Sequence, residues 1–433
     1  MILDKYLSDT GHYISEKVNL SAGTLAWGLN AKKKAKEMPG FINATIGSAT
    51  EDNGDLLSFP TLVEEIKKLT PDQLFAYANM RGVVEFVHAW KKDTLETYPA
   101  KIREDADRLS TLPVTSCGGL TSGLMLASQL FFDRNDPLMA PNSRWGNVDN
   151  VFFKNQRLRE ETYQLLDNEG NLAFSDLIHD MKKLEKNEKK IGIYLNFPNN
   201  PSGISPTIDQ VKEFQEALHE VEKPTVILVD DAYEGYVYED DALNHSIFPY
   251  LVGMNDNVLP IKVDGPSKRY CAYGARLGMV TLGFGNEVED SQKYEIRETI
   301  AKIARTNTSS SPRGIQEALT NVLTDPIKNK KIAEERARNL NLMKKRYMLV
   351  KEYIENAESK KLYPVNFNSG FFSYFLIKTQ QSASEIAQQL LDLGLGTVPF
   401  VNEKNGLNGI RVAFCSISTE KITDAMDIIY SLD

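Results

Sequence analysis

The chain has 433 residues, of which 42% are hydrophobic and 25% charged, ordinary values for a globular protein large enough for two or three domains. Its formal net charge of −9 argues against a nucleic-acid-binding surface, because neutralising phosphates requires clustered Lys and Arg. The three cysteines stand far apart and the five histidines lack metal-ligand spacing, so we expect neither a disulfide framework nor a metal site.

The sequence also gives an expectation for location. Residues 1–5 carry charge where a signal peptide would place its apolar core. No uninterrupted apolar stretch approaches the ~20 residues that a membrane span needs. We therefore expect a cytoplasmic protein that binds neither membranes nor nucleic acids.

Short apolar runs alternate with helical patterns between about residues 110 and 290. The runs expected to form strands are 137–140, 191–195, 225–229, 258–263 and 279–284. Between two of them, Thr207 and Gln210 have the spacing of a capping box at the start of a helix. Strands alternating with helices in this way predict an α/β fold, with a mainly parallel sheet covered by helices on both faces.

The pattern changes after Pro326. A long, charged helix is expected from about 330 to 355, followed by a strand over 370–377, a helix near 384–393 and a last helix after Thr419. These elements indicate a smaller α+β domain built from both chain ends. We expect residues 1–50 to pack with this small domain, 51–325 to form the large domain, and 326–433 to form the small C-terminal domain.

A glycine-rich turn joins a strand-like segment to an apolar helix at Gly118–Thr121. Glycines and small hydroxyl residues at a helix start expose backbone N–H groups at the positive end of the helix dipole, which is a site for phosphate. An ordinary glycine-rich turn has the same pattern, so this motif alone does not decide its role.

Asp230 directly follows the apolar run 225–229, so its carboxylate is expected near a buried edge, where it needs a partner. The protonated nitrogen of a pyridine ring would be one, and Asp231 is the rival by position. Asn200 and Tyr233 can each serve a phenolate oxygen on the same ring, although Asn200 also suits a structural turn. Trp145, just past a strand, can stack on a ring or belong to the core.

Lys268 follows the strand 258–263 in a short turn, with Arg276 eight residues later. Forming an imine with an aldehyde requires an unprotonated amine, and burial beside cations lowers the pKa of a lysine. Arg276 offers a planar fork for phosphate oxygens. A single lysine in a loop is usually solvated, but the ordered set of Asn200, Asp230, Lys268 and Arg276 indicates a pyridoxal-phosphate enzyme.

In this order the residues resemble the fold-type I pyridoxal-phosphate enzymes, and more closely the class I aminotransferases of the aspartate aminotransferase type. The resemblance covers most of the chain and is carried by residues 42–47, 76–79, 119–121, Trp145, 200–203, 230–233, 267–268, Arg276 and 409–413. It implies a homodimer with shared active sites that uses pyridoxal 5'-phosphate. The implied reaction is transamination between an L-amino acid (aspartate or another dicarboxylic or aromatic amino acid) and a 2-oxo acid, through an internal lysine imine.

The resemblance also implies a role for each site residue. Lys268 would form the imine and move the substrate α-proton, while Asp230 would pair with the ring nitrogen. The other cofactor-binding residues that it implies are Gly119, Leu120, Thr121, Trp145, Asn200, Tyr233, Ser267 and Arg276, with Tyr77 reaching the phosphate of the partner subunit. Substrate would be bound by Gly47, by Arg411 at the α-carboxylate and by Arg305 at a distal carboxylate.

The sequence alone also allows both arginines to have no part in substrate binding. By strand alternation alone, Arg411 could face solvent, and Arg305 could simply stabilise the C-terminal end of a helix over 292–304. Two positions depart from the family pattern: Gly265 stands where relatives often place a phosphate-binding serine, and Leu120 where they place a small residue.

Two other functions remain open from the sequence. The first keeps the cofactor and changes the chemistry to that of an amino-acid lyase or decarboxylase. The second is a cofactor-binding regulatory module, for which this acidic chain offers no basic N-terminal segment as a DNA-binding domain.

Overall fold

The computed structural model describes residues 4–18, 23–402 and 406–432. Its largest sheet has seven strands in the order β2-β8-β7-β6-β5-β3-β4. Their bounds are β2 (Val114–Cys117), β3 (Pro137–Pro141), β4 (Arg159–Tyr163), β5 (Ile191–Asn196), β6 (Thr225–Asp230), β7 (Val258–Asp264) and β8 (Leu277–Leu282). Strands β3 to β7 pair in parallel, and β8 runs antiparallel to both β7 and β2. The α/β class with a mainly parallel sheet is confirmed.

Helices cover both faces of this sheet. The helices of the chain are α1 (Asp9–Lys17), α2 (Gly23–Glu37), α3 (Pro60–Lys68), α4 (Pro71–Phe75), α5 (Val84–Glu96), α6 (Ala100–Arg108), α7 (Leu120–Phe131), α8 (Phe174–Glu185), α9 (Ile208–His219), α10 (Phe248–Leu251), α11 (Pro266–Arg269), α12 (Asp290–Asn307), α13 (Arg313–Thr324), α14 (Pro326–Asn356), α15 (Ala383–Asp392) and α16 (Ile422–Tyr430). The expected capping box of α9 is present, with both Thr207 and Gln210 bonded as the motif requires.

Alternation along β5 and β6 divides the core into two layers. Ile193 and Ile227 pack in one hydrophobic cluster with residues of α8, α9 and α10. Tyr194 and Leu228 pack in another cluster, with residues of α7 and α12 on the opposite face. Because successive side chains of a strand point to opposite faces, Asp230 at the end of β6 lies on the same face as Leu228.

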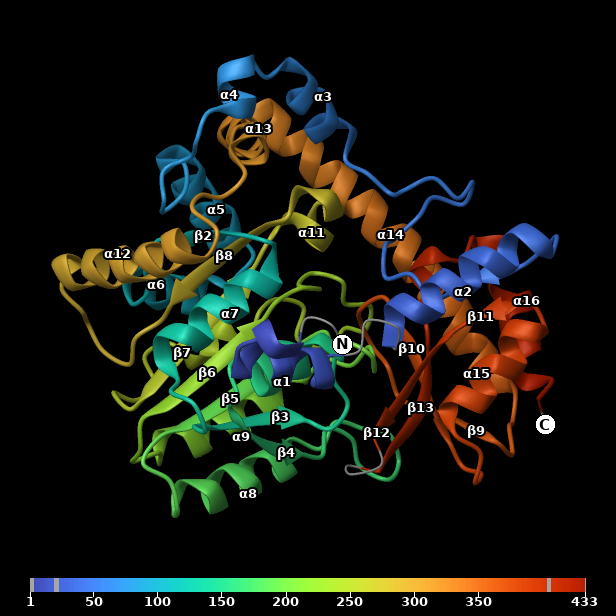
Figure 1. Cartoon of the computed structure of the whole chain (residues 1–433). Helices are drawn as coiled ribbons and strands as arrows, with labels where there is room; N and C mark the ends of the chain where they lie inside the picture. The colour runs from blue at the N-terminus through green and yellow to red at the C-terminus, as the bar shows by residue number, and fades with distance from the viewer. Residues whose placement is uncertain (1–3, 19–22, 403–405, 433) are drawn as a thin grey trace.

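A second, antiparallel sheet stands beside the large one (Figure 1). Its four strands are ordered β12-β13-β10-β9, with bounds β9 (Leu362–Pro364), β10 (Ser373–Ile377), β12 (Val398–Asn402) and β13 (Leu407–Val412). The long helix α14 leads into this sheet from the top of the molecule (Figure 1). Near it, β1 (Ile42–Asn43) pairs in parallel with β11 (Leu395–Gly396), which ties the N-terminal part of the chain to its C-terminal part. The domain boundaries at residues 50 and 325 stay predictions.

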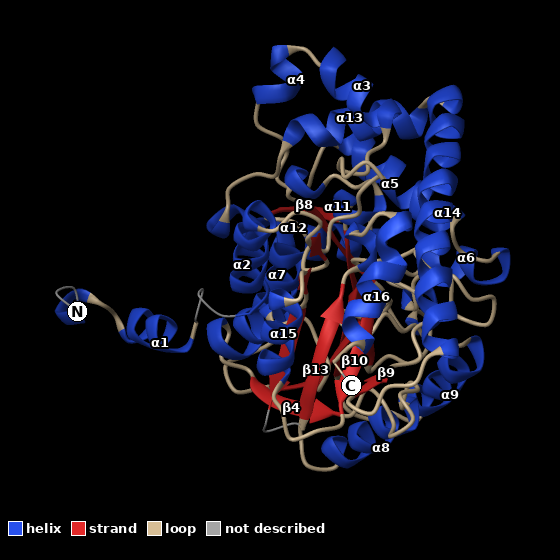
Figure 2. Ribbon diagram, turned by 90° about the vertical axis from the view of Figure 1, so that its right-hand side faces the viewer, coloured by secondary structure: helices blue, strands red, loops and turns tan. Residues whose placement is uncertain are grey.

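Some elements were not predicted from the sequence. β4 is the edge strand of the large sheet and carries Arg159, Glu160 and Glu161, which form ion pairs or hydrogen bonds, so it lacks an apolar run. α1 buries none of its residues. Figure 2 shows it projecting to one side, where the guanidinium of Arg157 lies 4.5 Å from the centre of its Tyr13 ring. Within the described parts of the chain, no helix combines the length and apolar character needed to cross a membrane.

Candidate active site

The carboxyl ends of β5, β6 and β7 bring together three of the segments singled out in the sequence. Asn196 and Asp230 are register partners at the ends of β5 and β6, and Asp230 pairs in turn with Val263 of β7. The side chain of Asn196 donates to the carbonyl of Asp230 (2.9 Å) and accepts from the backbone N–H of Asn200 (3.0 Å). Ligand sites of open α/β sheets lie at this edge, beyond the carboxyl ends of the strands.

Asp230 is buried with one carboxylate oxygen unused. Tyr194 donates its hydroxyl to Oδ2 at 2.7 Å, whereas Oδ1 has no hydrogen-bond partner in the described structure. Burial raises the pKa of Asp230, and the hydroxyl of Tyr194, the charge of Lys268 and the nearby backbone N–H of Ala232 oppose this rise only in part. A buried carboxylate oxygen that lacks a donor is an unfavourable arrangement, unless a ligand supplies the donor.

Lys268 approaches this carboxylate from the next strand connection. It lies in the single turn of α11, with its amine 5.2 Å from the centre of the Tyr233 ring. Burial is the main cause that lowers the pKa of Lys268, and the charge of Arg276 adds to it, while Asp230 opposes both. The lowered pKa favours the unprotonated amine that imine formation requires.

Asp231 has different surroundings. Its Oδ2 accepts from Ser246 at 2.6 Å and forms an ion pair with Lys262, which is buried. Burial raises the pKa of Asp231 to about 7 despite the charge of Lys262. Asp230 is therefore the carboxylate on the side of Lys268, and Asp231 belongs to a separate group of charges.

Arg411 joins the small sheet to the same site. Its guanidinium is buried, donates to Asn200 Oδ1 (3.0 Å) and to the carbonyl of Thr45 (2.8 Å), and lies 4.2 Å from the centre of the Phe372 ring. No carboxylate among the described residues pairs with it, and its Nε has no acceptor. Burial lowers the pKa of Arg411 from its usual value. The side chain does not face solvent, and a carboxylate ligand would supply the missing charge.

Gly47 and Tyr233 border this arginine. A Cβ built on Gly47 would lie 3.1 Å from Cζ of Phe372 and 3.9 Å from the Tyr233 hydroxyl, so the backbone of Gly47 approaches the site closely. Burial raises the pKa of Tyr233 well above that of a free phenol, and Asn200 is a hydrogen-bond neighbour that lowers it slightly. A neutral hydroxyl and an amide thus lie side by side, as expected for two groups that share one ligand oxygen.

The glycine turn and Arg276 also come together. Gly118 and Gly119 both donate their backbone N–H to the carbonyl of Arg276 at 2.9 Å, and Arg276 Nη2 donates to the carbonyl of Gly118 at 2.6 Å. Gly119 has φ +74°, and a Cβ there would lie 3.0 Å from Arg276 Nη2. Leu120 and Thr121 then open α7, so an exposed arginine stands beside the start of a twelve-residue helix. This combination suits a phosphate group.

The two departures from the family pattern prove to be neighbours. A Cβ on Gly265 would lie 2.8 Å from Leu120 Cδ1 and 2.7 Å from the carbonyl oxygen of Leu277. The leucine side chain therefore fills the space that a side chain at position 265 would need. Ser267, two residues further on, is buried in α11 beside Lys268.

Trp145 is half-buried against the hydrophobic cluster of α7, so part of its ring belongs to the core. Its loop is tied to the Asn200 loop, because Asn199 donates to the carbonyl of Ser143 at 3.4 Å.

Tyr77 and Arg305 are not brought to Lys268 within this chain. The side chain of Tyr77 is 86% exposed. Arg305 lies in the last turn of α12, as expected of a cation near a helix end, and donates to Ser309 Oγ at 2.9 Å. It borders a groove of about 630 Å³ together with Asn79 and Met80, which directly follow the Tyr77 segment. Arg305 therefore lies beside residues 79–80, two to three positions after the exposed Tyr77.

Two residues of the site, Tyr194 and Asn196, were not predicted from the sequence. Tyr194 occupies a strand whose six residues are all buried, and a buried tyrosine hydroxyl usually needs a partner, which was the available signal. Asn196 lies in the motif before Asn200, but only the register of β5 against β6 shows that it binds Asp230.

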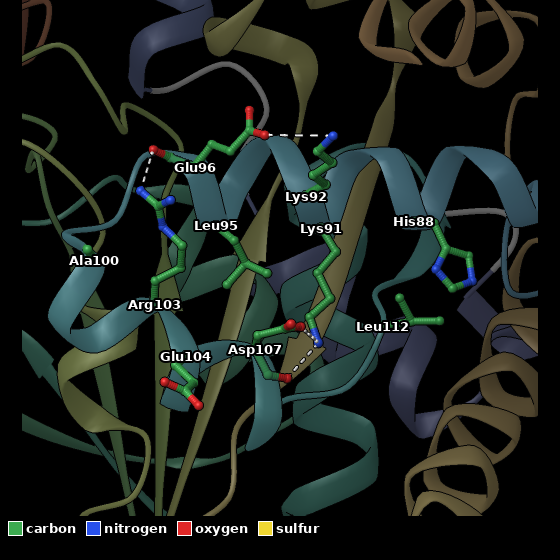
Figure 3. Close-up of a pocket in the computed structure, with 10 residues that line it drawn as sticks. All are labelled: His88, Lys91, Lys92, Leu95, Glu96, Ala100, Arg103, Glu104, Asp107 and Leu112. Atoms are coloured by element: carbon green, nitrogen blue, oxygen red, sulfur yellow. Dashed lines mark hydrogen bonds and ion pairs between the residues drawn. The ribbon is translucent and has the colours of Figure 1, made fainter.

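Another groove, of about 650 Å³, lies between α5 and α6. The residues that line it are His88, Lys91, Lys92, Leu95, Glu96, Ala100, Arg103, Glu104, Asp107 and Leu112 (Figure 3). It shares no residue with the site around Lys268. Its charges largely pair with each other, as in Lys91–Asp107 at 2.9 Å. Among the described residues, no group of His, Cys, Asp or Glu is arranged to hold a metal ion.

The residues around Lys268 fit pyridoxal phosphate. Asp230 offers an unused oxygen to the ring nitrogen, Tyr233 and Asn200 adjoin each other for the ring oxygen, and the glycine turn with Arg276 suits the phosphate.

Comparison with known proteins agrees with this site. Over 237 residues the chain is 28% identical to the histidinol-phosphate aminotransferase of Sulfurimonas denitrificans. This aligned region covers 54% of this chain and only 57% of that relative. An aminotransferase structure from Anaerococcus prevotii superposes with a TM-score of 0.84 at 19% identity, covering 96% of this chain and 97% of that one. The aspartate aminotransferase of Thermus thermophilus with maleate gives 0.75 at 16% identity and 99% coverage of both chains.

At these identities the two superpositions show the fold alone. The family rests on a different match, in which residues 40–429 fit the family model described as aminotransferase class I and II. The predicted family is thereby confirmed: the chain belongs to the class I and II aminotransferases.

Proposed function

We propose that this protein is a pyridoxal-phosphate-dependent aminotransferase in which Lys268 carries the cofactor. Pyridoxal phosphate is the cofactor of class I and II aminotransferases of this fold. When bound, it supplies an electron sink that accepts the electron pair left when the substrate α-proton departs. The residues of this chain would bind the cofactor, orient it and move the proton.

The observation that carries the proposal is that Lys268 lies close enough to Asp230 for each charge to shift the pKa of the other. An amine whose pKa is lowered by burial faces a buried carboxylate that has one oxygen without a donor. Asp230 would hold the proton on the ring nitrogen, with Tyr194 fixing its other oxygen at 2.7 Å. Lys268, once released from the cofactor, would take the proton from the substrate α-carbon.

Arg411 supports an amino-acid or 2-oxo-acid substrate. Its guanidinium is held by Asn200 and Thr45 but has no carboxylate among the described residues, so we assign it to the substrate α-carboxylate. Asn200 would thus touch both the arginine and the ring oxygen. Gly47 lets the backbone lie close to Phe372, because a Cβ there would lie only 3.1 Å from Cζ of that ring.

We also propose that the functional unit is a homodimer with shared sites. Tyr77 is 86% exposed, which suits a residue that reaches the phosphate of a partner subunit. Arg305 borders the groove next to the Tyr77 segment, so it would enter the same partner site and bind the distal carboxylate of a dicarboxylic substrate.

A single-turnover assay separates transamination from lyase or decarboxylase chemistry. The holoenzyme is mixed with an amino donor in the absence of a 2-oxo acid, and the products are counted. Transamination predicts about one 2-oxo acid per site and then no further reaction, because the amino group stays on the enzyme. Continuous release of ammonia or carbon dioxide would instead make the protein a lyase or decarboxylase.

Steady-state kinetics with a 2-oxo acid present tests Arg305. Arg305→Leu should lose far more kcat/KM with aspartate than with phenylalanine or alanine, because only aspartate brings a second carboxylate. An equal loss with all three donors would leave Arg305 as a helix-end residue.

A further inference from the structure

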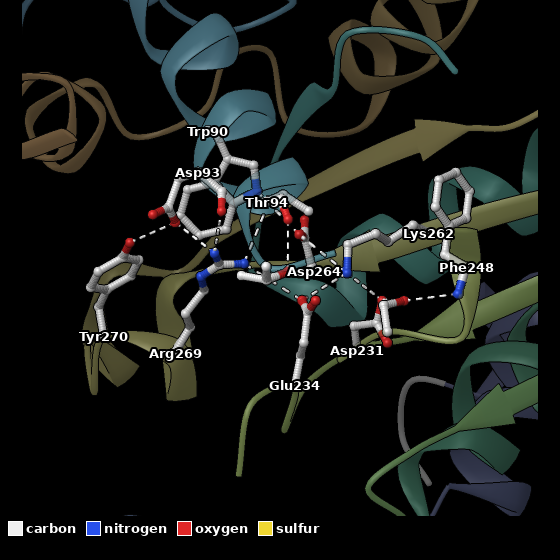
Figure 4. Close-up of polar contacts among 12 residues, drawn as sticks. Trp90, Asp93, Thr94, Asp231, Glu234, Phe248, Lys262, Asp264, Arg269 and Tyr270 are labelled. Atoms are coloured by element: carbon white, nitrogen blue, oxygen red, sulfur yellow. Dashed lines mark hydrogen bonds and ion pairs between the residues drawn. The ribbon is translucent and has the colours of Figure 1, made fainter. Parts of the chain in front are cut away.

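A buried chain of charges includes the residues that directly follow Asp230 and Lys268 in the sequence (Figure 4). It contains Asp231, which follows Asp230, and Arg269, which follows Lys268. The other members are Asp93, Glu234, Lys262 and Asp264, all of them buried. None of these six side chains has a role in the proposed chemistry. The next residue after each proposed catalytic group therefore faces the same buried cluster.

One half of the cluster anchors Asp231. Lys262 on β7 forms ion pairs with Asp231 and with Glu234 Oε2 (2.8 Å), and lies 3.6 Å from Asp264 Oδ2. The other half anchors Arg269, whose Nη2 donates to Asp93 Oδ2 of α5 at 2.6 Å and whose guanidinium lies 5.2 Å from the centre of the Trp90 ring. Tyr270 also donates to Asp93 at 2.9 Å, so two successive residues after Lys268 are held by α5.

Glu234 connects the two halves. Its Oε2 is 2.8 Å from Lys262 Nζ and 3.5 Å from Arg269 Nη1, so one carboxylate oxygen bridges the cation beside Asp231 and the cation beside Lys268. Lys262 also has Asp231, and Arg269 also has Asp93. Glu234 is therefore not required to neutralise either cation, since each cation already has another carboxylate as a partner.

The site depends on such an anchor, because α11 is a single turn of four residues. Among the described residues, the amine of Lys268 has no hydrogen-bond partner that would fix its direction towards Asp230; it lies 5.2 Å from the centre of the Tyr233 ring. Its direction therefore depends on the backbone of residues 266–270. Tyr236 contributes a hydrogen bond to the carbonyl of Lys268 (3.1 Å), and Arg269 and Tyr270 contribute the link to α5.

We propose that Glu234 is a positioning residue, which sets the separation of Lys268 and Asp230 by bridging Arg269 to Lys262. The proposal rests on the assignment of Lys268 and Asp230 made above. Displacing a reacting group by about 1 Å can cost on the order of a hundredfold in rate, so a bridge behind both groups affects turnover without touching the substrate.

The test is Glu234→Gln in the holoenzyme, which breaks the charged bridge and leaves Lys262 paired with Asp231 and Asp264 and Arg269 paired with Asp93. We expect kcat to fall by about tenfold or more while KM for the amino donor changes less than about threefold, because only positioning is affected. The visible circular dichroism per bound cofactor should fall as well, because the ring is held less rigidly. Arg269→Lys should retain more of both signals than Arg269→Met, and this pair decides the matter if Glu234→Gln does not fold.

The matched control is Glu65→Gln. Glu65 is also a buried glutamate that bridges two cations, Lys68 (2.9 Å) and Lys328 (3.0 Å), but on α3 and α14. It should leave kcat and the dichroism unchanged. The proposal is overturned if Glu234→Gln keeps both within about twofold, or if Glu65→Gln loses as much. Borohydride reduction of the wild-type holoenzyme and peptide mapping show separately whether Lys268 carries the cofactor, so a wrong lysine is distinguished from a wrong positioning residue.

Discussion

Asp230 and Asp231 show how one peptide unit separates two functions. Asp230 ends β6 on the face of Tyr194 and the α7 layer, near Lys268, while Asp231 pairs with Lys262. The sequence singled out both carboxylates, because a carboxylate that directly follows an apolar run is expected near a buried edge. It did not indicate Tyr194 or Lys262 as their partners, because these contacts depend on strand register.

Exchanging either carboxylate for an amide tests this division. Asp230→Asn should still bind cofactor but lose roughly 10²–10³ in kcat, because a neutral amide no longer stabilises the protonated ring nitrogen. Asp231→Asn should lose about tenfold or less, since Lys262 keeps Glu234 as a partner at 2.8 Å. Steady-state kinetics on both purified variants gives the comparison. A larger loss in Asp231→Asn would mean that the assignment is off by one residue.

At the scale of elements, the buried strands were the most predictable part. β3, β5, β6 and β7 are nearly continuous apolar runs because both sheet faces are covered, and all four were expected within one or two residues. β4, α1 and α2 were not, because their contacts are largely polar or exposed. The fit between Leu120 and Gly265 was also hidden, since α7 and the turn before α11 are far apart in sequence.

A double-variant cycle measures that fit. Gly265→Ser should destabilise the protein by about 1–3 kcal/mol, because its Cβ meets both Leu120 Cδ1 and the carbonyl of Leu277. Leu120→Ala removes one of these contacts, so the double variant should recover part of the loss, with a coupling of about 0.5–3 kcal/mol. Denaturant midpoints of the four proteins provide the numbers. Strict additivity would show that the two side chains do not compete for the same space.

For the whole molecule, the arrangement of both sheets brings residues from the beginning, middle and end of the chain to one site. Thr45, Asn200 and Arg411 are joined by hydrogen bonds of 2.8 and 3.0 Å. Strand alternation could not decide whether Arg411 faces this site or solvent, because the answer depends on how the small sheet packs on the large one. Tyr77 and Arg305 lie instead at the exposed surface of the chain.

Subunit complementation tests the proposed dimer. In the proposed dimer, Tyr77→Phe would weaken phosphate binding in the partner's site, and Lys268→Ala would inactivate its own site. After subunit exchange, hybrid dimers should contain one site with neither substitution, so activity should rise above that of either variant alone. Mixed protein that exchanges subunits, verified by mass, and gains no activity would contradict a site shared in this way.

The visible absorbance and turnover of Lys268→Ala test most directly whether Lys268 carries the cofactor. The wild-type holoenzyme should absorb in the visible range as an imine of the cofactor, since burial lowers the pKa of the Lys268 amine. The alanine variant should lose that band and almost all turnover, because the same residue holds the cofactor and moves the substrate proton. A Lys268→Ala protein that keeps the imine band with bound cofactor would show that another lysine does both, and the account of this site would be wrong.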